Sequence, residues 1–285
     1  MRNIILPIIY ITLIFYGPAA ILEASEIELT GGINNMAFDS AETSQIPQFE
    51  GSQYIIGDLK LDNSINNVLG YNLHYSRDPV LQNNVTGKIW ANTKNLNLEF
   101  GVFFGIDDKF KKMDLGISGG IELLFPGILF LSFNGSTSID IKNEYFANNN
   151  RQTMEAKFGF WLPNLLPVFS ADIKTYTREE ENSLILRDEL IRLMFSTEIF
   201  AKNFPVIFRI DAGYDILSHS RENGNSGSTE LKYVFAGLEM KWQLIRQIRL
   251  IAGFEMPVYF IESEKNLADL IHLYKAYGGF ALTFF

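Results

Sequence analysis

The sequence predicts an all-β fold, a closed antiparallel barrel whose strands cross a membrane, and three observations support this. From residue 26 onward apolar and polar side chains alternate with a period of two, the period of a β-strand. Short and long connections alternate between these segments. The last segment, Tyr277–Phe285, alternates up to two terminal aromatic residues. Such a strand suits a barrel, because it pairs with the first strand and leaves no edge exposed to lipid.

The N-terminal segment, residues 1–24, has the three parts of a cleaved signal peptide. Arg2 is a short basic region, residues 4–20 are an apolar core, and Ala24 is a small residue suited to cleavage. A membrane anchor is the alternative, but prolines interrupt the apolar core and no basic cluster follows it. We therefore expect a signal peptide at 1–24 and a single barrel domain at 25–285.

Segment 113–125 illustrates the alternation. Leu115, Ile117 and Ile121 fall on one face of the expected strand, and Asp114 and Glu122 fall on the other. A soluble antiparallel sandwich also alternates. However, the polar faces are rich in glycine and small hydroxyl residues, which suits the wall of a water-filled lumen, and a sandwich does not explain the alternating connection lengths.

We expect about fourteen strands, with twelve or sixteen as alternatives, and both chain ends on the periplasmic side. The expected strands are 26–39, 51–62, 69–77, 84–93, 96–107, 113–125, 128–141, 152–162, 167–177, 188–200, 205–217, 230–243, 248–259 and 271–285. Aromatic residues near strand ends are expected to form girdles at the two headgroup levels, although β-propensity alone also favours them. They are Phe49, Tyr54, Tyr145, Phe146, Phe160, Trp161, Tyr176, Phe204, Trp242, Tyr259 and Tyr274.

Two stretches resemble known outer-membrane proteins. The run Tyr277–Phe285 is similar to the C-terminal insertion signal of bacterial outer-membrane barrels, with Tyr277, Gly279, Leu282 and Phe284 filling its pattern. Residues 31–39, GGINNMAFD, resemble the first strand of small treponemal (spirochaete) outer-membrane barrel proteins, which are presumed porin-like. The resemblance implies the outer membrane of a diderm bacterium, with recognition of segment 277–285 by the barrel-assembly machinery. It implies no defined chemistry.

The sequence carries little catalytic or metal-binding chemistry. There is no cysteine, and the three histidines, His74, His219 and His272, are far apart. The only candidate catalytic groups are His219-Ser220 beside Asp215, and His74 with Asp78, and we interpret both histidines as solvated loop residues. We therefore expect no enzyme, no metal and no cofactor. The net charge of −9 argues against a nucleic-acid partner.

Charged residues on the expected inner faces give the best functional clue, because charges in a lumen wall must be wetted or paired. The expected pore-lining residues are Lys157, Lys174, Arg192, Arg209, Lys241, Arg249, Asp114, Glu122, Glu155, Asp172, Asp211 and Glu239. About fourteen strands enclose more space than side chains fill. We therefore expect a passive, porin-like channel for small hydrophilic solutes with a weak cation preference. The alternative is a surface-exposed structural or adhesin-type barrel with a closed lumen.

Overall fold

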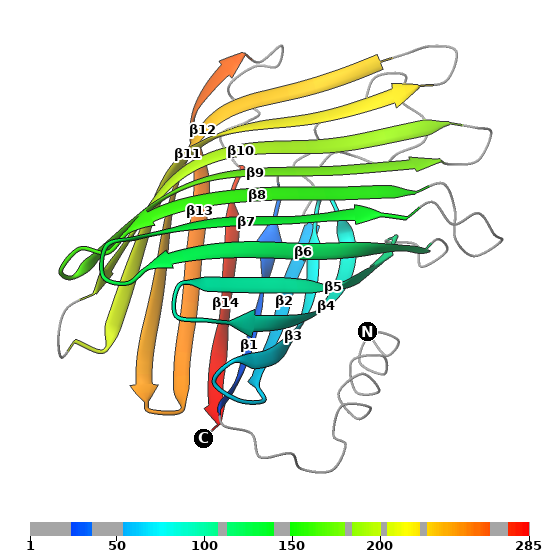
Figure 1. Ribbon diagram of the computed structural model, residues 1–285. Coiled ribbons are helices and arrows are strands. Elements are labelled where there is room, and N and C mark those ends of the chain that lie inside the picture. The colour runs from blue at the N-terminus through cyan, green and yellow to red at the C-terminus, as the bar shows by residue number, and fades with distance from the viewer. Residues whose placement is uncertain are drawn as a thin grey trace, which may run out of the picture.

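A computed structural model shows a closed barrel of fourteen antiparallel strands (Figure 1). It describes residues 24–35, 54–107, 113–139, 149–179, 184–200, 204–222, 227–262 and 273–284. The strands are β1 Ala24–Asn34, β2 Tyr54–Ser64, β3 Leu69–Asp78, β4 Gln82–Asn92, β5 Leu96–Ile106, β6 Met113–Phe125, β7 Leu129–Ser138, β8 Asn150–Phe160, β9 Leu165–Glu179, β10 Ile185–Phe200, β11 Val206–Glu222, β12 Gly227–Ile245, β13 Ile248–Glu262 and β14 Lys275–Phe284.

Consecutive strands pair with each other, and β1 pairs with β14 to close the wall. The closing ladder has ten residue pairs, from Ser25 with Phe284 to Asn34 with Lys275. The predicted count of fourteen and the predicted up-and-down order are therefore confirmed. The expected signal peptide lies outside the described residues except for Ala24, where β1 begins.

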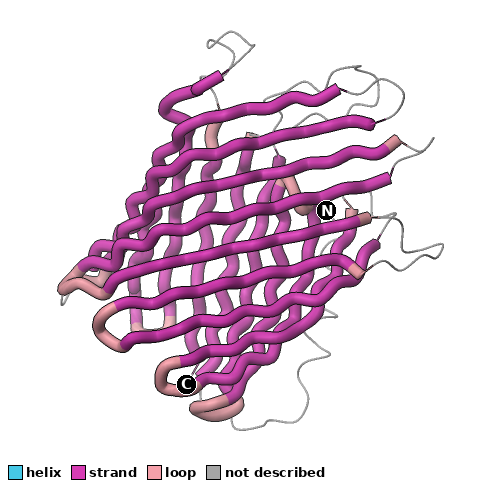
Figure 2. The backbone as a smooth tube through the Cα atoms, turned by 45° about the horizontal axis from the view of Figure 1, so that its top comes forward, coloured by secondary structure: helices cyan, strands magenta, loops and turns pink. Residues whose placement is uncertain are grey.

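The two ends of the barrel differ, as the alternating connections predict. Five tight turns, at 65–68, 93–95, 126–128, 161–164 and 246–247, gather at one end with the partly described connection 201–205; we call it the turn end (Figure 2). The positive φ angles of Gly127 (74°) and Asn164 (65°) belong to two of these turns. At the opposite loop end the connection 79–81 is short, and the longest one, 35–53, is mostly outside the described residues.

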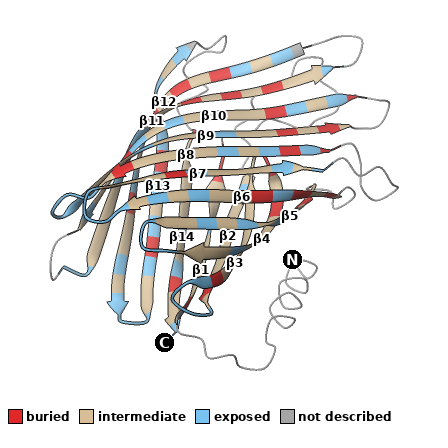
Figure 3. Cartoon of the chain, viewed as in Figure 1, coloured by how far each residue is buried: buried red, intermediate tan, exposed pale blue. Residues whose placement is uncertain are grey.

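The outer surface of the wall is apolar. Phe100, Met154 and Ile55 are 67%, 66% and 64% exposed, and each alternates along its strand with residues of the inner wall. Figure 3 shows exposed residues recurring along the strands of the wall. A contiguous apolar surface of this kind needs lipid or another protein against it. None of the described residues lies in a helix long and apolar enough to cross a membrane.

The apolar surface ends at a definite level on β9, β10 and β11. Ile173, Ile191 and Ile216 are register partners on the outward face. The next outward row toward the loop end is polar, with Thr175, Glu189 and Ser218 in register. These strands have 15, 16 and 17 residues, more than the ~9–11 that cross a membrane. The wall formed by β9–β12 therefore stands above the apolar band.

Two expectations about position are wrong. β11 continues to Glu222 and β12 begins at Gly227, so His219 lies within a strand rather than in a loop. Tyr176, expected in an aromatic girdle, is fully buried on the inner face of β9. Near the turn end, Trp161, Phe204 and Trp242 are 42%, 56% and 42% exposed, as girdle residues should be. Phe49, Tyr145 and Phe146 lie outside the described residues.

Candidate functional site: the lumen

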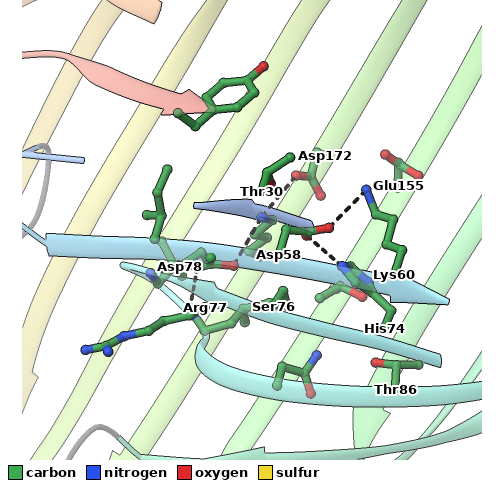
Figure 4. Close-up of a pocket in the computed structure, with 18 of the residues that line it drawn as sticks. Thr30, Asp58, Lys60, His74, Ser76, Arg77, Asp78, Thr86, Glu155 and Asp172 are labelled. Carbon is green, nitrogen blue, oxygen red and sulfur yellow. Dashed lines mark hydrogen bonds and ion pairs between the residues drawn. The ribbon is translucent and has the colours of Figure 1, made fainter. Parts of the chain in front are cut away.

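The inner faces of the strands enclose a cavity of about 710 Å³ (Figure 4). Residues from every strand except β5 line it. The lining includes nine carboxylates: Glu28, Asp58, Asp62, Asp78, Glu155, Asp172, Asp215, Glu239 and Glu255. It also includes eight basic residues: Lys60, Arg77, Lys88, Lys174, Arg192, Arg209, Lys241 and Lys275.

Arg192 is the centre of the most buried ion-pair cluster. Its Nε and one terminal nitrogen donate to the Asp215 carboxylate at 2.9 and 2.7 Å. Its terminal nitrogens also donate to the Glu255 carboxylate at 3.1 and 2.6 Å. The guanidinium lies over the Phe235 ring, 4.4 Å from its centroid. Arg192 of β10 thus connects Asp215 of β11 with Glu255 of β13 in one compact network inside the lumen.

A second network lies nearer the turn end. Arg209 pairs with Asp211 and with Glu239, both at 3.1 Å. Tyr277 donates to Glu239 at 2.5 Å, and Lys241 lies 3.3 Å from the same carboxylate. This network connects β11, β12 and β14 through side chains, although β14 pairs through its backbone only with β13 and β1.

A third group lies on the facing wall, on β2 and β3. The His74 Nε2 atom is 2.7 Å from Asp58 Oδ2, and the Lys60 ammonium is 3.2 Å from the other oxygen (Figure 4). On β4, Lys88 pairs with Glu99 at 2.8 Å. These contacts leave the lumen wall rich in charge but locally neutral.

The turn between β3 and β4 folds inward and covers the cavity. Val80 and Leu81, each 4% exposed, belong to a buried apolar cluster with residues of the far wall. We call this the roof cluster; it consists of Val80, Leu81, Tyr176, Leu217, Leu231, Tyr233, Phe235 and Leu273. Asp78 shapes the turn, because its Oδ1 accepts hydrogen bonds from the backbone amides of Val80 and Leu81 at 2.8 and 2.7 Å.

Two polar contacts fasten the turn to the opposite strands. Lys174 on β9 lies 3.3 Å from Asp78. Arg151 on β8 donates from Nε to the Leu81 carbonyl at 2.8 Å and pairs with Asp114 on β6. The Tyr176 ring lies beneath the Arg151 guanidinium at 4.0 Å. Polar contacts therefore attach the turn to two strands of the wall, β8 and β9, and Asp114 on β6 holds the Arg151 side chain in place.

The structure separates both pairs considered for catalysis. His219 pairs with Asp188, which also binds Arg178, whereas Asp215 binds Arg192. His74 binds Asp58, and Asp78 binds Lys174. Both histidines are therefore strand residues with carboxylate partners, and the interpretation of them as solvated loop residues is wrong. Among the described residues, no group of three or more His, Cys, Asp or Glu residues could hold a metal ion.

Seven of the twelve expected pore-lining residues line the cavity: Lys174, Arg192, Arg209, Lys241, Glu155, Asp172 and Glu239. The other five lie elsewhere on the inner wall. Lys157 pairs with Glu155 at 2.7 Å, Arg249 with Glu26 at 2.6 Å, Asp211 with Arg209, and Asp114 with Arg151. Glu122 lies on β6, in register with Ser132 of β7.

Sequence reasoning missed the roof. Its signal was present, because Pro79-Val80-Leu81 places apolar residues at a loop tip, where polar residues are usual.

Comparison with known proteins places this architecture among outer-membrane barrels. No protein-family model and no curated protein matches the sequence. An outer membrane channel from Pseudomonas putida F1 superposes with a TM-score of 0.55 at 8% identity, covering 95% of this chain and 98% of that one. The chain has the fold of an outer-membrane β-barrel. An anion-selective porin from Comamonas acidovorans is a more distant match, with a TM-score of 0.43 at 8% identity, covering 92% of this chain and 99% of that one.

Proposed function

We propose that the protein is an outer-membrane channel that lets small hydrophilic solutes diffuse through its lumen, and that it is not an enzyme. The observation that carries this proposal is the contrast between the two sides of one wall. The outer side is apolar over the membrane-spanning rows, and the inner side encloses a cavity of about 710 Å³ lined by seventeen Asp, Glu, Lys and Arg residues (nine acidic, eight basic). Charged groups at membrane depth require water or partners, and a water-filled lumen supplies both.

The ionic selectivity of such a channel follows from its lining. Nine carboxylates against eight basic residues leave an excess of one negative charge. We expect weak cation selectivity, measured as the reversal potential across a KCl gradient in planar bilayers. A reversal potential of the sign that anion selectivity gives would contradict this expectation.

Planar-bilayer recording of the purified, folded barrel tests the channel proposal. Stepwise conductance increments are expected, together with swelling of liposomes in small sugars. The control is the same preparation after heat unfolding. Folded protein that inserts into bilayers but neither conducts nor swells liposomes would remove the proposal.

The roof favours a second candidate function, a surface-exposed structural or adhesin-type barrel with a closed lumen. The turn 79–81 crosses toward the far wall and packs into a buried apolar cluster. If this arrangement is permanent, the loop end has no outlet there, and the exposed part of the molecule is the raised wall β9–β12. A barrel that stays non-conducting even after the roof cluster is weakened would support this candidate.

The assembly partner and the source belong to the same proposal. We propose that the barrel-assembly machinery recognises segment 277–285, because β14 alternates apolar and small residues and closes the ladder with β1. The resemblance of residues 31–39 to small treponemal barrels supports a spirochaete or other diderm bacterium as the source. Expression with residues 277–285 replaced by an unrelated alternating sequence, followed by membrane fractionation, tests the recognition step.

A further inference from the structure

The charges that line the cavity are already engaged with one another. At least six of the eight basic residues form ion pairs within 4.0 Å: Lys60, Lys88, Lys174, Arg192, Arg209 and Lys241. Eight of the nine carboxylates do so as well, with Asp62 as the exception among the described residues. A charged solute would have to break or crowd these pairs. The electrostatic part of the wall is therefore poorly suited to hold an ion at a fixed place.

One part of the wall offers hydrogen bonds without charge. Across β6, β7 and β8, the lumen-facing residues Ser118, Ser136 and Thr153 are register partners in one continuous row. We call these three the hydroxyl row; all of them line the cavity. A lysine lies in register at each end of the row. On one side Gly101 of β5 follows Ser118, and Lys88 of β4 follows Gly101; on the other side Lys174 of β9 follows Thr153. Both lysines are ion-paired.

The hydroxyl row has unused hydrogen-bonding capacity. Ser118 is 4% exposed, and its Oγ has no hydrogen-bond partner among the described residues. Ser136 and Thr153 share one hydrogen bond of 2.7 Å, so one of their two hydroxyl hydrogens remains available. On β4, the buried Asn84 also lines the cavity, and its Oδ1 accepts no hydrogen bond from the part of the chain that the structure describes. Ser118 lines the cavity although its Oγ is buried in the rotamer that the structure shows, so binding through this hydroxyl requires another of its staggered rotamers.

We infer that the cavity binds a neutral, polyhydroxylated solute of monosaccharide size against the hydroxyl row. The inference rests on the proposed channel function and names its substrate class. Solute hydroxyl groups both donate and accept, which matches free Ser and Thr hydroxyls and an Asn carbonyl. A buried polar group without a partner is costly, so a solute that supplies one gains from the contact. The volume of about 710 Å³ lies within the range of small-molecule sites.

The test compares three pyranoses that share a ring and differ in charge: glucose, glucosamine and glucuronate. Binding is measured by saturation-transfer NMR on the folded full chain in a detergent without a sugar headgroup. Passage is measured separately by liposome swelling. Glucose is expected to saturate at the lowest concentration of the three. An equal or lower half-saturating concentration for either charged sugar would overturn the inference.

Two single variants locate the site. Ser118→Ala and Thr153→Val each remove one hydroxyl of the row, and each should raise the half-saturating glucose concentration roughly three- to tenfold, the range for one neutral hydrogen bond. The matched control is Ser132→Ala: Ser132 is a buried, inner-wall serine of β7 that accepts a hydrogen bond from Asn134 and does not line the cavity. The control should bind glucose as the unmodified protein does.

The outcomes separate this inference from the channel proposal. Conductance without saturable glucose binding, or wild-type binding by both hydroxyl-row variants, overturns the substrate class and leaves the channel intact. Saturable glucose binding without conductance or swelling supports the site and removes the channel. Folding of each variant is checked by the heat-dependent gel mobility of the barrel. Glucose binding is interpreted separately for each variant, so if one variant fails to fold, the other still tests the inference.

Discussion

Shortening Leu81 to alanine tests whether the roof obstructs the lumen. The Leu81 side chain is 4% exposed and packs in the roof cluster, whereas its carbonyl accepts from Arg151. Leu→Ala in a closed core costs about 2–5 kcal/mol, and the lower value suits a cluster beside a hydrated lumen. A loss of about 2 kcal/mol changes the ratio of attached to detached roof by roughly 30-fold. The Arg151 and Lys174 contacts remain, so the barrel should still fold.

Single-channel recording measures this effect. Leu81→Ala should conduct more, or stay open longer, than the unmodified protein. The matched control is Ile251→Ala, because Ile251 is also 4% exposed and lines the cavity but lies outside the roof cluster. If both variants fold and neither changes the conductance or the open time, the roof does not obstruct the path, and the reasoning fails.

Three further predictions concern the wall. Phe195→Arg, which points a charge at lipid from the apolar band, should destabilise the barrel by ~2–4 kcal/mol in vesicles. Glu189→Arg, on the same face of β10 above that band, should cost less than ~1 kcal/mol; equal urea midpoints for the two variants would contradict a membrane boundary between these two positions. Arg192→Ala should cost ~3–5 kcal/mol in the same assay, since it leaves Asp215 and Glu255 buried without their cation, and Arg192→Lys should lose less; an Ala variant as stable as wild type would mean that water replaces the guanidinium. Deletion of Phe285 should slow assembly in cells and leave refolding in detergent unchanged, as read by heat-dependent mobility; equal defects in both would place the effect in stability rather than recognition.

Most of the wall was predictable because alternation is a local signal. Each strand presents its own inward and outward residues, so Asp114 and Ile117 are assigned to opposite faces from β6 alone. The ends of β11 and β12 were less predictable. Residues 218–222 are polar on both faces, as expected above a membrane, and the same composition is typical of a loop.

The contacts inside the lumen depend on distances across strands that no local pattern contains. Arg192 and Glu255 are three strands apart, and their pairing requires the curvature of the wall as well as its register. The same holds for Leu81, which shares a buried cluster with Tyr176 of the opposite wall. The sequence predicted that charges line the interior, but it could not say which of them neutralise each other.

The ladder between β1 and β14 has a consequence for how the molecule comes together. The other thirteen pairings join strands that follow one another in the chain, so each hairpin can form from nearby residues at small entropic cost. Only the pairing of β1 with β14 joins two strands that are far apart in the sequence. Until β1 and β14 pair, the sheet is open and has two unpaired edges, which can pair with other chains. Closure of the barrel therefore has to wait until both of these strands are available.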